Sequence, residues 1–110
     1  MTRPAVLVWQ HDAPPECLRE VAAGLEEEGV PFLVESHHGA AAELAEGAAA
    51  ASTVDIGIGV DAHGRICAQH AKLTGRAPVA LETAEHARLL GHNAARLVVG
   101  IPLKRKEQHR

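Results

Sequence analysis

Ala5-Val6-Leu7-Val8-Trp9 is an uninterrupted apolar run near the start of the sequence. Such runs are typical of strands that are buried on both faces, as they are in parallel sheets. Pro14 and Pro15 follow the run, and proline suits the first turn of a helix. The stretch therefore predicts a central strand that leads into a helix, which is the first unit of an α/β domain.

The spacing of apolar residues predicts this first helix and its end. Leu18, Val21, Ala22 and Leu25 recur at i, i+3, i+4 and i+7, which is the apolar stripe of an amphipathic helix. A glycine at position 29 and a proline at 31 are natural stop signals after a helix. The helix should therefore end close to residue 28.

The rest of the sequence alternates between strand and helix patterns. We expect strands at 32–34, 54–60, 65–69, 78–81 and 98–103, and helices at 40–51 and from Thr83, a plausible N-cap, through Leu97. A turn signal at 61–64 makes the strands on either side of it a hairpin. These elements predict a single layered α/β domain over residues 1–103, with a mostly parallel sheet, helices packed on it and one hairpin insertion. Residues 104–110 form a basic C-terminal tail.

The composition of the chain limits the kinds of partner that the protein can bind and the cellular compartment in which we expect it. Hydrophobic residues make up 46% of the 110 residues, which is enough for a core, and the net charge is −3. This acidic balance argues against nucleic acid as a partner, because phosphate binding needs clustered Lys and Arg. No apolar segment is long enough to cross a bilayer, so we expect no membrane partner. Cys17 and Cys67 have no metal or redox spacing, and we expect buried free thiols in a cytoplasmic protein.

One motif suggests a different function. Residues 57–62 match G-x-G-x-x-A after a strand, as in dinucleotide-binding loops. Such a loop should open a helix, but here a turn and a second strand follow. A stand-alone small α/β module that binds a nucleotide or another ligand remains the alternative hypothesis.

No catalytic constellation stands out. Ser36 and Ser52 lie outside a nucleophile-elbow motif, and the eight histidines show no paired metal-ligand spacing. Cys67 and His70 fall on opposite faces of the expected strand, which disfavours a dyad. We therefore expect no catalytic residues and no cofactor bound by this chain alone.

Three consecutive glutamates, Glu26, Glu27 and Glu28, close the first helix. Acidic residues at a helix C-terminus face the negative end of the helix dipole and cost roughly 0.3–1 kcal/mol each. On a helical wheel Glu27 points about 170° from the apolar face, while Glu26 and Glu28 lie on its flanks. The wheel therefore makes Glu27 the most outward carboxylate and the best placed to reach a partner or a shared cation.

Several segments, read in order, resemble the small subunit of the diol/glycerol dehydratase reactivase. They are Gly24-Leu25-Glu26-Glu27-Glu28-Gly29-Val30-Pro31, Val54-Asp55-Ile56-Gly57-Ile58-Gly59-Val60, His70-Ala71-Lys72-Leu73, Leu89-Leu90-Gly91-His92-Asn93-Ala94-Ala95-Arg96-Leu97-Val98 and Ile101-Pro102-Leu103. The resemblance runs from the first strand to Leu103. It assigns no role to His70 or Asn93.

The resemblance implies a non-catalytic subunit that resembles the dehydratase medium (β) subunit in fold. Two large and two small subunits form a chaperone-like factor, and the large subunit is an ATPase that holds ATP or ADP. The small subunit is thought to exchange with the dehydratase medium subunit, next to the dehydratase large subunit, so that damaged cobalamin leaves. In the family, the second glutamate, which is Glu27 here, reaches a divalent cation (Mg²⁺) held mainly by the large subunit. We therefore expect Glu26, Glu27 and Glu28 to lie in the interface with that partner. Diol or glycerol preference and association with a bacterial microcompartment remain open.

Overall fold

The computed structural model describes residues 4–73 and 78–100. Within them lie five strands and three α-helices: β1 (Val6–Gln10), α1 (Pro15–Glu27), β2 (Phe32–Ser36), α2 (Ala41–Ala51), β3 (Ile56–Val60), β4 (Ile66–His70), β5 (Ala80–Glu82) and α3 (Ala87–Val99). Two short 3₁₀ turns, Ala71–Leu73 and Ala84–His86, flank β5. None of the helices in the described part of the chain is long and apolar enough to cross a membrane.

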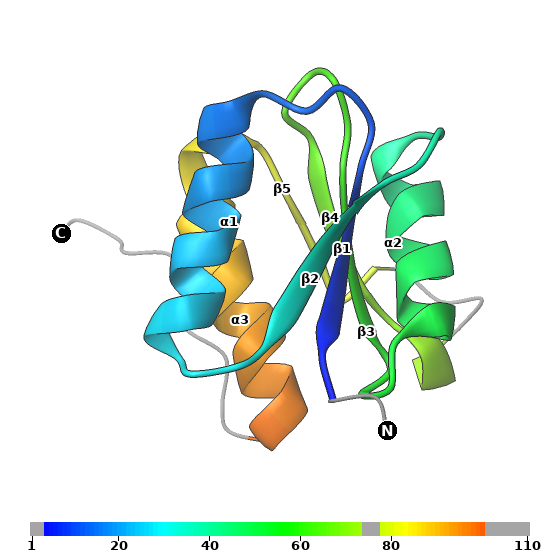
Figure 1. Ribbon diagram of the computed structural model, residues 1–110, viewed down its shortest axis with the longest axis vertical. Coiled ribbons are helices and arrows are strands. Elements are labelled where there is room, and N and C mark those ends of the chain that lie inside the picture. Colours follow the sequence, from blue (N-terminus) through cyan, green and yellow to red (C-terminus); the bar gives the residue numbers. More distant parts are fainter. Residues whose placement is uncertain (1–3, 74–77, 101–110) are drawn as a thin grey trace, which may run out of the picture.

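The strands form one mixed sheet in the order β2-β1-β3-β4-β5. β1 pairs in parallel with both β2 and β3, while β3–β4 and β4–β5 are antiparallel. Helices α1 and α3 cover one face of the sheet and α2 covers the other, which gives three layers (Figure 1). The predicted α/β class, the single layered domain and the hairpin are confirmed. The sheet is mixed where a mostly parallel one was expected, because two of its four pairings, β1–β2 and β1–β3, are parallel and the other two are antiparallel.

The predicted elements differ from the structure mainly near the C-terminus. Val98 and Val99 belong to α3 and not to a strand, because the helix continues to Gly100, which adopts a left-handed conformation with φ of 75°. Residues 101–103 of the expected strand, and the basic tail, lie outside the described residues. The side chain of Thr83 makes no capping hydrogen bond, and the chain passes through the 3₁₀ turn before α3 begins at Ala87.

The main core lies between the sheet and the α1–α3 layer, and its large members are aliphatic. Fully buried side chains include Val6, Val8, Val21, Leu25, Ile56, Ile58, Ile66 and Leu90. Cys17 and Cys67 are both buried free thiols, as expected from their spacing. Burial raises the pKa of the Cys67 thiol to about 11, so this sulfur stays protonated and behaves as an apolar group.

Glycines bring the helices unusually close to their neighbours. A Cβ on Gly57 or Gly59 would clash with the backbone of α2, so the G-x-G sequence lets α2 lie directly on β3. On the other face, a Cβ on Gly24 would clash with the carbonyl oxygen of Arg88, and one on Gly91 with that of Val21. Gly24 and Gly91 therefore let the backbones of α1 and α3 touch.

Replacing Gly91 by alanine should destabilise the fold. Alanine favours a helix over glycine by about 1 kcal/mol, but the added methyl group must push α1 and α3 apart, and such overpacking costs about 1–3 kcal/mol. We expect a net loss in the free energy of unfolding, measured by urea denaturation followed by circular dichroism. A Gly91→Ala variant more stable than the wild type would show that the two helices have room between them.

Candidate functional site

The three glutamates at the end of α1 face two different surroundings. Glu26 is exposed and lines a hollow beside β2, whereas Glu27 and the C-cap residue Glu28 extend toward α3. The side chain of Glu27 is 45% exposed and that of Glu28 only 15%. The wheel therefore placed Glu27 on the solvent side correctly, but it did not show that α3 lies close enough to reach it.

Both carboxylate oxygens of Glu27 are held by α3. The Nη2 atom of Arg88 donates to Glu27 Oε2 at 2.6 Å, and His92 Nε2 lies 2.7 Å from Glu27 Oε1. Arg88 also approaches a second acidic residue of α1, with its Nη1 atom 3.9 Å from Glu20 Oε1. The carboxylate of Glu27 is thus exposed to solvent but already engaged within the chain.

Glu28 is anchored by the same helix. His92 Nδ1 lies 2.7 Å from Glu28 Oε2, and Arg96 Nε donates to that oxygen at 3.0 Å. The imidazole of His92 is mostly buried, with its side chain 13% exposed, and it bridges the two carboxylates. A neutral imidazole has one N–H, so both contacts are hydrogen bonds at once only when the ring carries two protons.

Arg88, His92 and Arg96 form one stripe on α3 because they are four residues apart. We call these three residues and the two glutamates, Glu27 and Glu28, the α1–α3 charge network. Sequence reasoning missed the basic half of the network, although the spacing of four was a readable signal. What the sequence did not reveal is that the glycine contact would bring this stripe beside the end of α1.

The α1–α3 charge network changes the electrostatics of both acids. Partial burial raises the pKa of the Glu27 carboxyl, but hydrogen bonds from His92 and Arg88 outweigh it and lower the pKa below its ordinary value. For Glu28, the hydrogen bond from His92 lowers the pKa most, burial opposes it, and Arg96 adds to the lowering. Both carboxylates are therefore kept ionised although they lie at the negative end of a helix dipole.

The chemistry of Glu27 suits one ligand of a shared magnesium ion. A hard divalent cation prefers carboxylate oxygens, and Mg²⁺ takes about six oxygen ligands in all. Within residues 4–73 and 78–100, no group of three or more His, Cys, Asp or Glu side chains is arranged to hold a metal ion. Glu27 by itself could supply only one or two of the oxygen ligands that such an ion needs.

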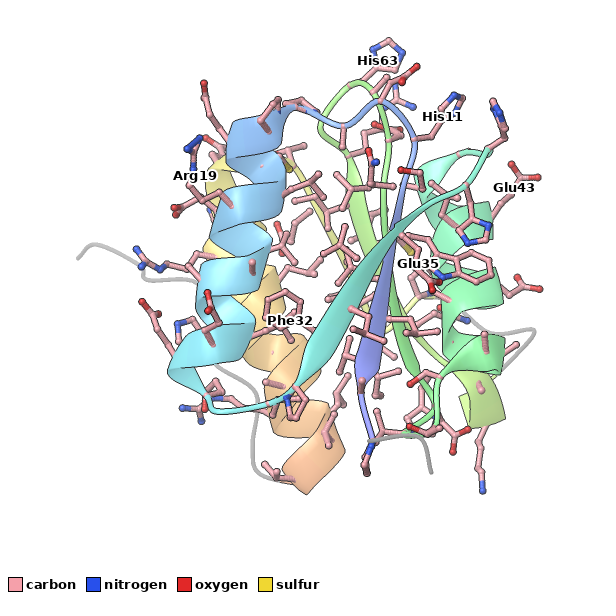
Figure 2. All side chains as sticks on the ribbon, in the orientation of Figure 1. His11, Arg19, Phe32, Glu35, Glu43 and His63 are labelled. Carbon is pink, nitrogen blue, oxygen red and sulfur yellow. The ribbon has the colours of Figure 1, made fainter. Side chains whose placement is uncertain are left out.

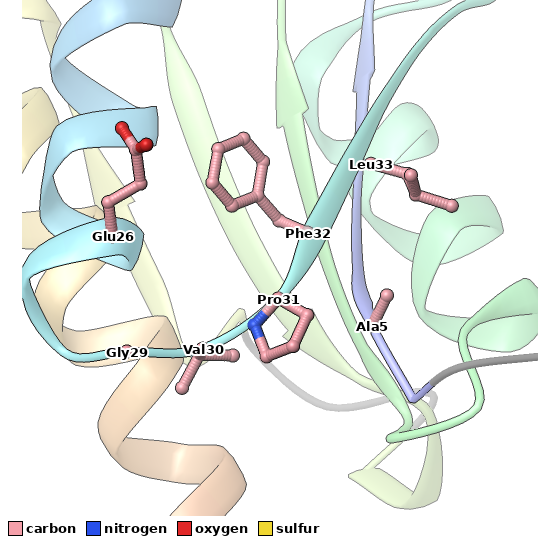
Figure 3. A pocket seen from close by; sticks show the side chains of 7 residues that line it. All are labelled: Ala5, Glu26, Gly29, Val30, Pro31, Phe32 and Leu33. Atoms are coloured by element: carbon pink, nitrogen blue, oxygen red, sulfur yellow. The ribbon is translucent and has the colours of Figure 1, made fainter.

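A hollow of about 570 Å³ lies beside Glu26, between the end of α1 and β2 (Figure 3). Its wall is formed by Ala5, Glu26, Gly29, Val30, Pro31, Phe32 and Leu33. The ring of Phe32 lies between β2 and α1, while Glu35 lies on the opposite face of β2 (Figure 2). β2 is an edge strand, and the side chain of Leu33 on it is 53% exposed. The hollow therefore places an exposed apolar surface next to Glu26.

The dinucleotide-like segment serves a structural purpose. Residues 61–64 form a turn between β3 and β4, so no helix follows Gly59. Asp61 stabilises this turn, since its Oδ1 atom accepts hydrogen bonds from the backbone N–H groups of His63 at 2.8 Å and Arg65 at 3.0 Å. Together with the packing of Gly57 and Gly59 on α2, this geometry removes the main support for the nucleotide-binding alternative.

Several other histidines in the described part of the chain make local contacts. His37 stacks on Trp9 with ring centroids 3.6 Å apart, and His11 meets His38 edge-to-face at 4.6 Å. His70 accepts a hydrogen bond from the backbone N–H of Lys72 at 3.1 Å. These contacts explain the positions of the rings by packing and turn formation.

Comparisons of the sequence and of the structure with known proteins point to the same family. The family model described as dehydratase medium subunit matches residues 3–104. The diol dehydratase-reactivating factor small subunit of Klebsiella michiganensis is 35% identical over 106 residues, covering 92% of this chain and 84% of that protein. The propanediol dehydratase-reactivating factor small subunit of Salmonella typhimurium is 34% identical, covering 92% and 90%.

Two solved structures superpose on the fold. A glycerol dehydratase reactivase chain matches with a TM-score of 0.87 and 34% identity, covering 94% of this chain and 98% of that one. A structure described as diol dehydratase-reactivating factor complexed with ADP and Mg²⁺ matches with a TM-score of 0.86 and 34% identity, covering 94% and 100%. The resemblance seen in the sequence is confirmed, and the chain belongs to the dehydratase medium-subunit family, among the small subunits of dehydratase-reactivating factors.

Proposed function

We propose that this chain is the small subunit of an ATP-dependent, chaperone-like reactivating factor for a coenzyme B12-dependent diol or glycerol dehydratase. The observation that supports this most is the agreement of sequence and fold over nearly the whole chain with reactivating-factor small subunits. In this proposal the chain acts in the cytoplasm and carries out no chemistry. It exchanges with the medium subunit of the dehydratase so that damaged cobalamin is released.

Two features favour exchange between subunits. The family model that matches this chain is the one described for a dehydratase medium subunit, so one fold suits both binding positions. Exchange also requires a surface that docks on either partner, with the difference in affinity deciding the outcome. The exposed end of α1 and the edge strand β2 together offer such a surface next to the Glu26 hollow.

We place ATP or ADP and most of the magnesium site on a large subunit, in an assembly of two large and two small subunits. A structural relative is described as complexed with ADP and Mg²⁺, which supports a nucleotide and a metal in the assembly. On this chain, Glu27 is the proposed metal ligand, while Glu26 and Glu28 belong to the surface that meets the partner. The ion supplies positive charge that links two carboxylate-bearing chains, and Glu28, held by His92 and Arg96, fixes the end of α1 from which Glu27 projects.

Replacing Glu27 by glutamine should weaken the complex with the large subunit and remove its dependence on magnesium. Hydrogen bonds to charged groups are worth about 1.5–3 kcal/mol, and a loss of this order at Glu27 corresponds to roughly a tenfold to hundredfold loss in affinity. The measurement is the dissociation constant of the two purified subunits in Mg²⁺ and then in EDTA.

Glu46 provides the matched control, because it is an exposed glutamate on α2, on the opposite face of the sheet. Glu46→Gln changes the net charge equally and should leave both the affinity and its magnesium dependence unchanged. Equal binding of the wild type and Glu27→Gln, in Mg²⁺ and in EDTA alike, would rule out the bridging role while keeping the subunit assignment. Absence of binding by the wild type would count against the assignment itself.

The lowered pKa values of Glu27 and Glu28 predict acid sensitivity of the fold. A carboxyl whose pKa is lower in the folded chain than in the unfolded chain stabilises the fold above the ordinary glutamate pKa of about 4.3. This contribution is lost as the pH falls through the lower folded value. We therefore expect the free energy of unfolding to fall between pH 5 and pH 3 (roughly one unit on either side of that pKa).

The Glu28→Gln variant isolates the contribution of the α1–α3 charge network to this acid sensitivity. It should be less stable than the wild type near neutral pH and should lose less stability on acidification, because one of the titrating carboxyl groups is gone. Urea denaturation at several pH values measures both effects. Parallel stability curves for wild type and Glu28→Gln across this range would contradict the prediction.

A further inference from the structure

We propose that Arg88 acts as an internal counter-cation that occupies Glu27 in the free subunit and must leave it when the partner's divalent cation binds. This inference rests on the proposed function of Glu27 and adds a control step to it. The direct observation is that Arg88 Nη2 lies 2.6 Å from Glu27 Oε2 while His92 takes the other oxygen.

The two cations compete for one carboxylate because of their charge. A magnesium ion binds a carboxylate oxygen at about 2.0–2.1 Å. With the guanidinium 2.6 Å from Oε2, an ion on the same oxygen would lie within roughly 5 Å of a positive charge, and such a pair repels. Binding of the ion at Oε2 is therefore favourable only after Arg88 has moved.

The structure offers Arg88 a second position. Glu20 lies on α1 two turns before Glu27, and its Oε1 atom is already 3.9 Å from Arg88 Nη1. The side chains of Arg88 and Glu20 are about half exposed, at 51% and 47%, so water surrounds both and a small rotation is sufficient. Arg88 can thus turn from Glu27 to Glu20 without being left unpaired, while His92 and Arg96 keep Glu28 in place.

The consequence is that the free subunit carries a neutralised Glu27 until a stronger cation arrives. Exposed ion pairs contribute about 0–1 kcal/mol, so a guanidinium holds the carboxylate weakly. A divalent ion with ligands from the large subunit displaces it, whereas a surface without that ion does not. Arg88 would therefore favour the complex that contains magnesium over other docking partners.

Two substitutions with opposite expected effects test the inference. Arg88→Gln removes the competitor and should tighten the magnesium-dependent complex with the large subunit by about twofold to fivefold. Glu20→Gln removes the second position and should weaken that complex by a similar factor. The measurement is the dissociation constant in Mg²⁺, repeated for Arg88→Gln in the Glu27→Gln background, where the gain should vanish.

The outcomes separate this inference from the proposed function. If Glu27→Gln weakens the complex but Arg88→Gln leaves it unchanged or weakens it, the counter-cation role is wrong and the role of Glu27 stands. If Glu27→Gln has no effect, the metal role fails. In the isolated subunit, nuclear magnetic resonance of the Arg88 guanidinium gives a partner-independent readout. Its rotation should stay restricted in Glu20→Gln, where Glu27 is the remaining partner of the two, and should become free when Glu20→Gln is combined with Glu27→Gln. Free rotation in Glu20→Gln alone would overturn the inference.

Discussion

The contact between the backbones of α1 and α3 is the constraint on which the site depends. Gly24 and Gly91 have no Cβ, and any side chain at either position would clash with a backbone atom of the facing helix. At this separation the side chains of α3 reach the carboxylates at the end of α1 at hydrogen-bonding distance. The apolar core below the two helices fixes their rotation, so packing and charge arrangement are set together.

Much of the fold follows from patterns that the sequence displays openly. The apolar run of β1, the i, i+3, i+4 stripe of α1 and the turn at 61–64 each specify an element by local chemistry. The end of α3 was misread, because the apolar residues at 98–99 suit a helix as well as a strand, and Gly100 was the stop signal. β4 and β5 pair in antiparallel fashion. The spacing of apolar residues within each segment does not indicate which segments pair with each other.

The candidate site was predictable only in part. The acidic half was visible because three glutamates at a helix C-terminus oppose the helix dipole, and Glu27 pointed away from the apolar face. The basic half is equally regular in the sequence, since Arg88, His92 and Arg96 are spaced by four. A helical wheel, however, treats one helix at a time, so the meeting of the two stripes required the tertiary structure. Family resemblance singled out Glu27 as an expected ligand but gave no information on its surroundings.

The energies of these contacts suggest why such a network suits a binding surface. Each acid at the helix C-terminus costs roughly 0.3–1 kcal/mol, and each exposed ion pair returns about 0–1 kcal/mol, so the two contributions largely cancel. Apart from Glu28, whose side chain is only 15% exposed and which supports the fold, the α1–α3 charge network therefore adds little to the stability of the fold near neutral pH, and its main effect is to orient the carboxylate of Glu27. It holds one carboxylate in a defined place by contacts weak enough to be exchanged. A tightly buried ion pair in the same position would cost several kcal/mol to break and would hold Glu27 permanently. The half-exposed position of Glu27 and Arg88 thus reconciles a well-ordered carboxylate with one that remains available to a competing cation.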